Sequence, residues 1–326
     1  MSGTRVLEFL ACPKCRERLN GDYACKQCGY VARQDEGLLD FLSAADRPAS
    51  ADAVTAFYEK KPFPGYALED TPATVFDRAK SSPFLEGLER AIPAKASVID
   101  CGCGTGQLAA FLAIASPSRS VVGVDACRAS LMEAARFRDK ARLTNLSLIR
   151  ADIFALPLRE ALFDVVIGRG VVHHNDDPDA AIRSIARLVA PGGYLVLGFY
   201  ERAARLFHRI RFHLSKLNGN PIQWMDPILR NQGIDDDKKR TWIADQYEHP
   251  LEKLLPLPHV VSVLEDAGME WIRSVPPLPS SGRFFHKTVR LNALEFFSLR
   301  TSWAIAGIGD EDAGLISVIA RRLRDE

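Results

Sequence analysis

Three groups of residues in this chain have the types and the spacing that binding or catalysis requires. Two Cys-x-x-Cys pairs stand near the N-terminus, at residues 12–15 and 25–28. Residues 100–106 read Asp-Cys-Gly-Cys-Gly-Thr-Gly, with glycine at alternate positions. Two histidines, His173 and His174, are adjacent. Thiolates at this spacing hold metal ions, glycine-rich turns hold nucleotides, and an imidazole transfers protons near neutral pH.

The glycine-rich segment has the sequence of a strand, a turn and a helix. The β-branched residues Val98 and Ile99 precede the acidic Asp100, and residues 107–115 favour a helix. In an α/β fold this arrangement lets the backbone approach a ligand, and the helix N-terminus offers free N–H groups. The spacing Asp-x-Gly-x-Gly-x-Gly differs from the Gly-x-Gly-x-x-Gly of dinucleotide sites. The glycines are Gly102, Gly104 and Gly106.

This pattern resembles motif I of the class I S-adenosylmethionine (SAM)-dependent methyltransferases (type 11-like), and four later segments continue the resemblance in the family's order. They are residues 121–125, 151–153, 163–167 and 191–197. The resemblance implies that Asp125 holds the ribose hydroxyls and that Asp152 contacts the adenine amino group. A generic nucleotide-binding or inactive Rossmann-like domain is the alternative. The cofactor-binding residues that the resemblance implies are Asp100, Gly102, Gly104, Gly106, Gln107, Asp125, Ala126, Asp152, Ile153, Arg169, Gly170 and Tyr58.

The four N-terminal cysteines predict a metal site. Cys12 and Cys15 form one pair, Cys25 and Cys28 the other, and nine residues separate the pairs. Two such turns close a tetrahedral Cys₄ zinc site, and because thiolates fill every position the metal would be structural. The module resembles the small zinc ribbon found ahead of many methyltransferase domains. A metal-free or redox-active cysteine cluster is the alternative.

The resemblance implies an α/β fold: a Rossmann-like sheet of seven strands with helices on both faces, preceded by the zinc ribbon. Residues 269–275 are expected to form the sixth strand. Residues 315–320 are expected to form the last, which in the family lies antiparallel between the fifth and the sixth. We divide the chain into a zinc-ribbon module (1–43), a linker with an N-terminal helical lid (44–90) and the methyltransferase domain (91–326). An inserted segment at about 201–257 is expected to cap the acceptor pocket.

Aromatic residues between the modules predict either a lid or a packing contact. Residues 57–66 hold four aromatic side chains and two prolines. Prolines restrict the backbone and aromatic rings favour burial. Segments before motif I fold over the cofactor in this family, so Tyr58 and Tyr66 are the lid candidates. The alternative is that these rings join the ribbon to the main domain.

The adjacent histidines follow the predicted fourth strand, at the edge of the sheet where ligands bind in open α/β folds. They resemble the hydrophobic-His-His signature of a broad methyltransferase group. His173 or His174 is a candidate base for an oxygen acceptor, and the alternative is that both imidazoles only hold the loop. Candidate acceptor-binding residues are Tyr66, Tyr200, Tyr247 and His249.

Composition gives no support to a dedicated nucleic-acid binder. The chain has 42 basic and 41 acidic residues, a net charge of +1, and nucleic-acid binders carry a basic excess. No apolar stretch approaches the roughly 20 residues of a membrane span, and no signal peptide is recognised, so we expect a cytoplasmic, bacterial protein. The predicted function is methylation of a small or medium-sized acceptor with SAM and one structural Zn²⁺. The alternatives are an RNA methyltransferase that docks through the ribbon and the basic helix 202–216, and a non-catalytic SAM-binding scaffold.

Overall fold

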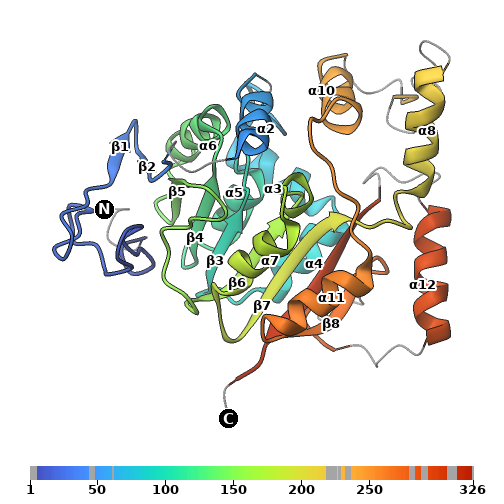
Figure 1. The fold of residues 1–326 in the computed structure, drawn as a ribbon. Coiled ribbons are helices and arrows are strands. Elements are labelled where there is room, and N and C mark those ends of the chain that lie inside the picture. Colours follow the sequence, from blue (N-terminus) through green and yellow to red (C-terminus); the bar gives the residue numbers. More distant parts are fainter. Residues whose placement is uncertain are drawn as a thin grey trace.

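In the computed structural model, one β-sheet runs through the molecule. The model describes residues 6–43, 48–60, 62–217, 226, 229–231, 236–278, 283–287, 293–306 and 314–324. The strands are β1 (Arg33–Asp35), β2 (Leu38–Asp40), β3 (Ser97–Cys101), β4 (Ser120–Asp125), β5 (Leu146–Arg150), β6 (Phe163–Arg169), β7 (Val189–Tyr200), β8 (Met269–Val275) and β9 (Leu315–Arg322). Their order is β1-β2-β5-β4-β3-β6-β7-β9-β8 (Figure 1).

The central strands are buried on both faces. Val98 and Ile99 of β3 and Val121 and Val122 of β4 are at most 1% exposed, as continuous β-branched runs predict for parallel strands. Residues on alternate sides enter two separate apolar clusters: Ile99 and Val122 belong to one, Val98 and Val121 to the other. The sheet is therefore the middle layer of an α/β fold, as predicted.

Helices cover these two faces. They are α2 (Ala49–Lys60), α3 (Pro72–Lys80), α4 (Pro83–Ala91), α5 (Gln107–Ala115), α6 (Arg128–Lys140), the short 3₁₀ helix η1 (Val172–His174), α7 (Pro178–Ala186), α8 (Leu206–Leu217), α10 (Asp236–Tyr247), α11 (Leu257–Asp266) and α12 (Ala293–Ala306). Side chains of α4, α5 and α6 lie in one apolar cluster, and those of α7 and α11 in the other. None of the helices in the described part of the chain is long and apolar enough to span a membrane.

The predicted seven-stranded order is confirmed. Strands β3 to β6 pair in parallel, β7 continues this arrangement, and β9 lies antiparallel between β7 and β8. The last strand therefore enters the sheet where the resemblance places it. Residues 269–275 form β8 in full, and the predicted 315–320 strand forms most of β9.

Two further strands extend the sheet beyond the seven. Strand β2 of the N-terminal module pairs in parallel with β5, with Leu39 opposite Ile149. Strand β1 pairs antiparallel with β2. Phe9 also stacks on Phe163 with ring centroids 4.6 Å apart. The N-terminal module is thus joined to the edge of the main sheet, at the left of Figure 1.

The predicted inserted segment contributes α8 and α10. Figure 1 shows these helices and α12 on the side of the sheet opposite to β1 and β2. Residues 218–225, 227–228 and 232–235 of this segment lie outside the described residues. The division of the chain near residues 43, 90 and 201–257 stays a prediction.

Candidate functional site

A cavity of about 540 Å³ lies at the carboxyl ends of the central strands. This is where ligands bind in open α/β sheets. Eleven of the twelve predicted cofactor-binding residues line it: Asp100, Gly102, Gly104, Gln107, Asp125, Ala126, Asp152, Ile153, Arg169, Gly170 and Tyr58. The twelfth, Gly106, is the left-handed N-cap of α5, with φ +72°.

Gly102 and Gly104 of the turn occupy positions where a side chain would not fit. Both have positive φ, +72° at Gly102 and +53° at Gly104. A Cβ at Gly102 would overlap the side chain of Val171, and one at Gly104 would lie 2.7 Å from the carbonyl oxygen of Phe63. The turn therefore packs directly against the segments on either side of the cavity, and a side chain would force them apart.

Asp125 at the end of β4 organises the turn. Its two carboxylate oxygens accept hydrogen bonds from the N–H groups of Gly104 and Cys127, both at 2.8 Å. Burial raises the pKa of Asp125, while these backbone donors oppose the rise. The carboxylate is thus fixed at the position from which a ribose-binding acid would act.

Asp100 is a second buried acid on the same wall. Burial and the neighbouring Asp125 raise its pKa to about 7, and Arg169 acts in the opposite direction. Two carboxylates close together in a buried wall favour a ligand that carries positive charge.

The segment before α3 covers the glycine turn. Phe63 and Pro64 line the cavity together with Ala51, Val54 and Tyr58 of α2. The Gln107 side chain donates to the carbonyl oxygen of Gly65 at 2.8 Å, and the Thr105 hydroxyl donates to that of Pro64. These contacts place residues 62–65 over the turn, which is the position expected for a lid.

The two lid tyrosines differ in position. Tyr58 lines the cavity, and its hydroxyl donates to Asp245 at 3.0 Å. Tyr66 is absent from the cavity lining and stacks on Phe137 of α6, with ring centroids 4.3 Å apart. Its position favours the packing alternative, whereas that of Tyr58 favours the lid.

His173 and His174 both line the cavity and are buried. Within the described part of the chain neither ring nitrogen of His173 has a hydrogen-bond partner, and burial holds the pKa of this histidine well below the usual range. Burial also lowers the pKa of His174 to about 4. The Nδ1 of His174 lies 2.8 Å from the carbonyl oxygen of Leu251, so this nitrogen carries the proton and Nε2 has a free lone pair.

The predicted acceptor-binding residues also differ in whether they line the cavity. Tyr200, at the end of β7, lines the cavity 4.2 Å from the His173 ring. Tyr247 and His249 are not in the lining. The Tyr247 hydroxyl donates to Asp226 at 2.7 Å, and the His249 ring lies tilted against that of His174, with ring centroids 3.8 Å apart. His249 therefore supports a cavity residue from behind.

Three residues of α10 form a cavity wall that sequence reasoning missed. Trp242, Asp245 and Gln246 all line the cavity. Positions i, i+3 and i+4 share one face of a helix, so helical periodicity within residues 242–247 was the signal that could have found them. Tyr247 and His249 were chosen by residue type instead: Tyr247 lies off this face, and His249 follows the end of the helix.

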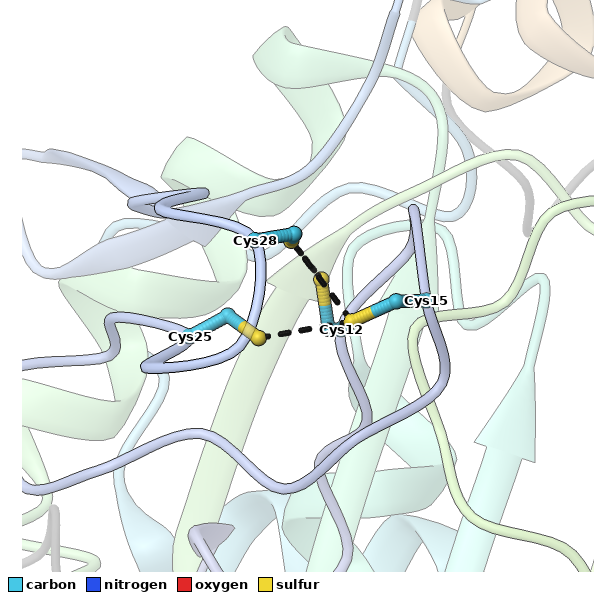
Figure 2. Close-up of side chains that lie close together, drawn as sticks. All are labelled: Cys12, Cys15, Cys25 and Cys28. Atoms are coloured by element: carbon cyan, nitrogen blue, oxygen red, sulfur yellow. Dashed lines mark hydrogen bonds between the residues drawn. The ribbon is translucent and has the colours of Figure 1, made fainter.

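The four predicted metal ligands come together in the N-terminal module. Their sulfur atoms all lie within 4.8 Å of one another, and the two turns face each other in Figure 2. Three pairs are 3.4–3.5 Å apart: Cys12 with Cys28, Cys15 with Cys25, and Cys15 with Cys28. Four sulfurs bonded to one zinc at ~2.3 Å are separated by ~3.8 Å, so this set fits tetrahedral Zn²⁺ closely.

Several basic side chains of residues 202–216 are buried, so the surface of this segment carries fewer positive charges than its sequence suggests. Arg205, His208 and Arg211 are at most 7% exposed. Arg205 pairs with Glu252 at 2.7 Å. The exposed face of α8 carries Leu206, Ile210 and Leu214 beside Arg209 and His213; the side chain of Lys216 lies outside the described residues.

Comparison with known proteins adds independent findings. Residues 99–197 match the family described as a methyltransferase domain. An uncharacterized protein of Synechococcus is 30% identical over 172 residues, which are 50% of this chain and 40% of that protein. An uncharacterized methyltransferase of Mycobacterium tuberculosis is 35% identical over 102 residues, which are 31% of this chain and 48% of that protein.

The chain spans less than half the length of these curated relatives. Among solved structures, PKMT2 from Rickettsia typhi in complex with AdoHcy is similar with a TM-score of 0.50 and 14% identity. That likeness covers 76% of this chain and 54% of the other. At this identity it shows a shared fold.

Proposed function

We propose that the core of this chain is a class I methyltransferase domain and that the protein uses SAM to methylate an oxygen or nitrogen atom of a small or medium-sized acceptor. One observation carries the proposal. A single cavity of about 540 Å³ is lined on one side by the glycine turn, Asp125 and Asp152, and on the other by polar side chains of η1, β7 and α10. Its volume lies in the range of small-molecule sites.

The residues of the nucleotide wall fit SAM. The carboxylate of Asp125 is held by backbone donors and can accept two bonds from ribose hydroxyls, and Asp152 lies at the end of the neighbouring strand β5. SAM supplies an activated methyl group, so the main task of the protein is to align the acceptor with it and to exclude water. The lid residues Tyr58, Phe63 and Pro64 line the same cavity and exclude water from it.

The histidines position the acceptor in this proposal. His173 is neutral and buried, so the one of its two ring nitrogens that carries no proton can accept a hydrogen bond from an acceptor O–H or N–H. The His174 ring is fixed by its bond to Leu251 and by contact with the His249 ring. His173 is therefore the better placed of the two to contact the acceptor.

The ribbon cysteines are assigned a structural Zn²⁺. Four thiolates leave no open position for a substrate or water, so no catalytic step is assigned to the metal.

The test is transfer of labelled methyl from SAM into a cell extract, fractionated into nucleic acid, protein and small molecules, with the Asp125→Ala protein as the blank. Label in the small-molecule pool supports the proposal. RNase-sensitive label would establish the RNA alternative and make the exposed residues of α8 and the ribbon the docking surface. Tight binding of S-adenosylhomocysteine (SAH) without transfer to any pool would indicate a non-catalytic scaffold.

A further inference from the structure

The acceptor side of the cavity contains a buried carboxylate with no cationic partner. Asp245 of α10 is 8% exposed and lines the cavity. It accepts one hydrogen bond from the Tyr58 hydroxyl at 3.0 Å and one from Nε2 of Gln246 at 2.7 Å. Both donors are neutral, and no ion pair of Asp245 occurs within the described part of the chain.

The nearest buried cation is already committed to other groups. The guanidinium of Arg205 pairs with Glu252 at 2.7 Å and donates to Oε1 of Gln246, also at 2.7 Å. It also covers one face of the Tyr200 ring at 3.6 Å. Arg205 thereby fixes the orientation of the Gln246 amide, and through it the carboxylate of Asp245, without neutralising that carboxylate itself.

The other cations of the lining belong to a different part of the cavity. Arg78 pairs with Asp70, and Arg169 packs over the Phe84 ring at 4.9 Å. Both histidines on the acceptor side are held neutral by burial, which lowers their pKa values. A buried carboxylate costs free energy unless it is paired, so this wall favours a positively charged ligand and repels an anionic one.

Aromatic rings complete this environment. Tyr58, Trp242 and Tyr200 line the cavity beside Asp245. Ring faces next to a carboxylate are the usual surroundings of a bound ammonium ion, because the ring quadrupole attracts a cation. The neutral His173 can accept a hydrogen bond from an N–H of the same ligand.

We propose that the acceptor is a primary or secondary amine, which binds as its ammonium ion with Asp245 as counter-charge. This inference rests on the proposed methyltransferase function. The ammonium loses one proton to the Asp245 carboxylate, directly or through water. The nitrogen lone pair then forms the N–CH₃ bond while the carbon–sulfur bond breaks, with its electron pair remaining on sulfur. The products are an N-methylammonium ion and a neutral thioether, and the proton on Asp245 is released to solvent.

The experiment separates labelled products by charge. After methyl transfer from labelled SAM into the small-molecule fraction of an extract, the products are passed over a strong cation exchanger at neutral pH. N-methylated amines are retained, whereas O-methyl ethers of neutral acceptors and methyl esters of acids pass through. Unreacted SAM is itself a cation, so we expect more label to be retained than with the Asp125→Ala blank, which retains SAM only.

Two substitutions test the role of Asp245 as the counter-charge of the acceptor. We expect Asp245→Asn to raise the KM for the retained acceptor by about 10- to 100-fold, as expected for the loss of a charged partner, with the Kd of SAH unchanged. Glu248→Gln removes a charge from an exposed position just after α10 and is the matched control, expected to leave both constants unchanged. Unchanged SAH affinity in Asp245→Asn also shows that this variant is folded.

The outcomes distinguish the two proposals. Label in the unretained fraction, or an Asp245→Asn protein with an unchanged KM, overturns the amine acceptor and leaves the methyltransferase intact. No label in any fraction from a protein that binds SAH overturns the methyltransferase function, and the amine acceptor falls with it.

Discussion

At the scale of single residues, Asp125 links the glycine turn to the predicted ribose site. Replacing it with alanine removes the acceptor for two backbone N–H groups at 2.8 Å as well as the ribose contact. We expect Asp125→Ala to weaken SAH binding by about 100-fold or more, since hydrogen bonds to a charged group contribute ~1.5–3 kcal/mol each. Calorimetric titration measures this. Asp139→Ala, which removes an exposed acid of α6, is the control; equal affinities in the two variants would disprove the ribose assignment.

Asp100 makes the stability of the ligand-free protein depend on pH. Its pKa is about 7 in the folded protein, because of burial and Asp125, against 3.8 for an ordinary aspartate. The folded state therefore holds a proton that the unfolded chain has lost, and stability falls as the pH rises from about 4 to 7. The full difference corresponds to a few kcal/mol. Asp100→Asn removes this dependence, so we expect the variant to match the native protein near pH 4.5 and to have the higher Tm at pH 8.

Calorimetry of the ligand-free native and Asp100→Asn proteins between about pH 4.5 and pH 8 measures the two Tm values. A constant difference in Tm between Asp100→Asn and the native protein would contradict the buried, protonated state of Asp100.

The residues of the nucleotide wall were predictable because each follows a local signal. Asp100 and Asp125 end β-branched runs, and the glycines stand at fixed positions after the first of them. The acceptor wall has no such signal. Asp245 and Gln246 reach the cavity through contacts with residues distant in the sequence: Asp245 accepts from Tyr58, and Gln246 donates to the Tyr200 hydroxyl of β7.

At the scale of elements, the first cysteine turn is connected to the loop after β5 through Arg16. This residue follows Cys15 with φ +66°, and its guanidinium donates to the carbonyl oxygens of Leu156 and Leu158 at 2.9 and 2.5 Å. Leu156 lines the cavity four residues after Asp152. We expect Arg16→Ala to weaken SAH binding by about 3- to 30-fold, since two such bonds contribute ~1–2 kcal/mol, while one zinc per chain is retained.

The control for this prediction is Arg18→Ala, an exposed arginine two residues away. Titration with SAH and metal analysis of the same samples are the two measurements. An Arg16→Ala protein with normal SAH affinity would show that the ribbon does not support the cofactor pocket.

The pairing of β2 with β5 shows what the sequence leaves open between elements. The run Leu38–Leu39 predicts a strand, but its partner Ile149 is 110 residues away from Leu39, and a short strand carries no local mark of a distant partner. Strands β3, β4, β6 and β7 were predictable because their order follows from the family resemblance. The membership of β1 and β2 in the same sheet follows only from three-dimensional contacts.

At the scale of the whole molecule, the N-terminal cysteine module adds its strands to the main sheet, so loss of the proposed zinc is expected to reach the predicted cofactor site. The ribbon is too small to be stable through its own core, and structural zinc supplies much of the folding free energy of such modules. We expect Cys25→Ser, or chelation of the native protein, to release β1 and β2 from β5. Amide hydrogen exchange of Leu146–Arg150 should then accelerate by at least about tenfold, and SAH binding should weaken because the loop after β5 loses Arg16.

Cys127→Ser is the matched control for this last prediction. Cys127 lies outside the ribbon, at the N-cap of α6, where its sulfur accepts from the N–H of Ser130 at 3.5 Å and a serine hydroxyl can do the same. This variant should keep its zinc and the slow exchange of β5. If the chelated protein also keeps slow exchange in β5 and full affinity, the β-pairing, the Phe9–Phe163 contact and the Arg16 hydrogen bonds hold the N-terminal module to the sheet without zinc, and zinc has no part in forming the predicted cofactor site.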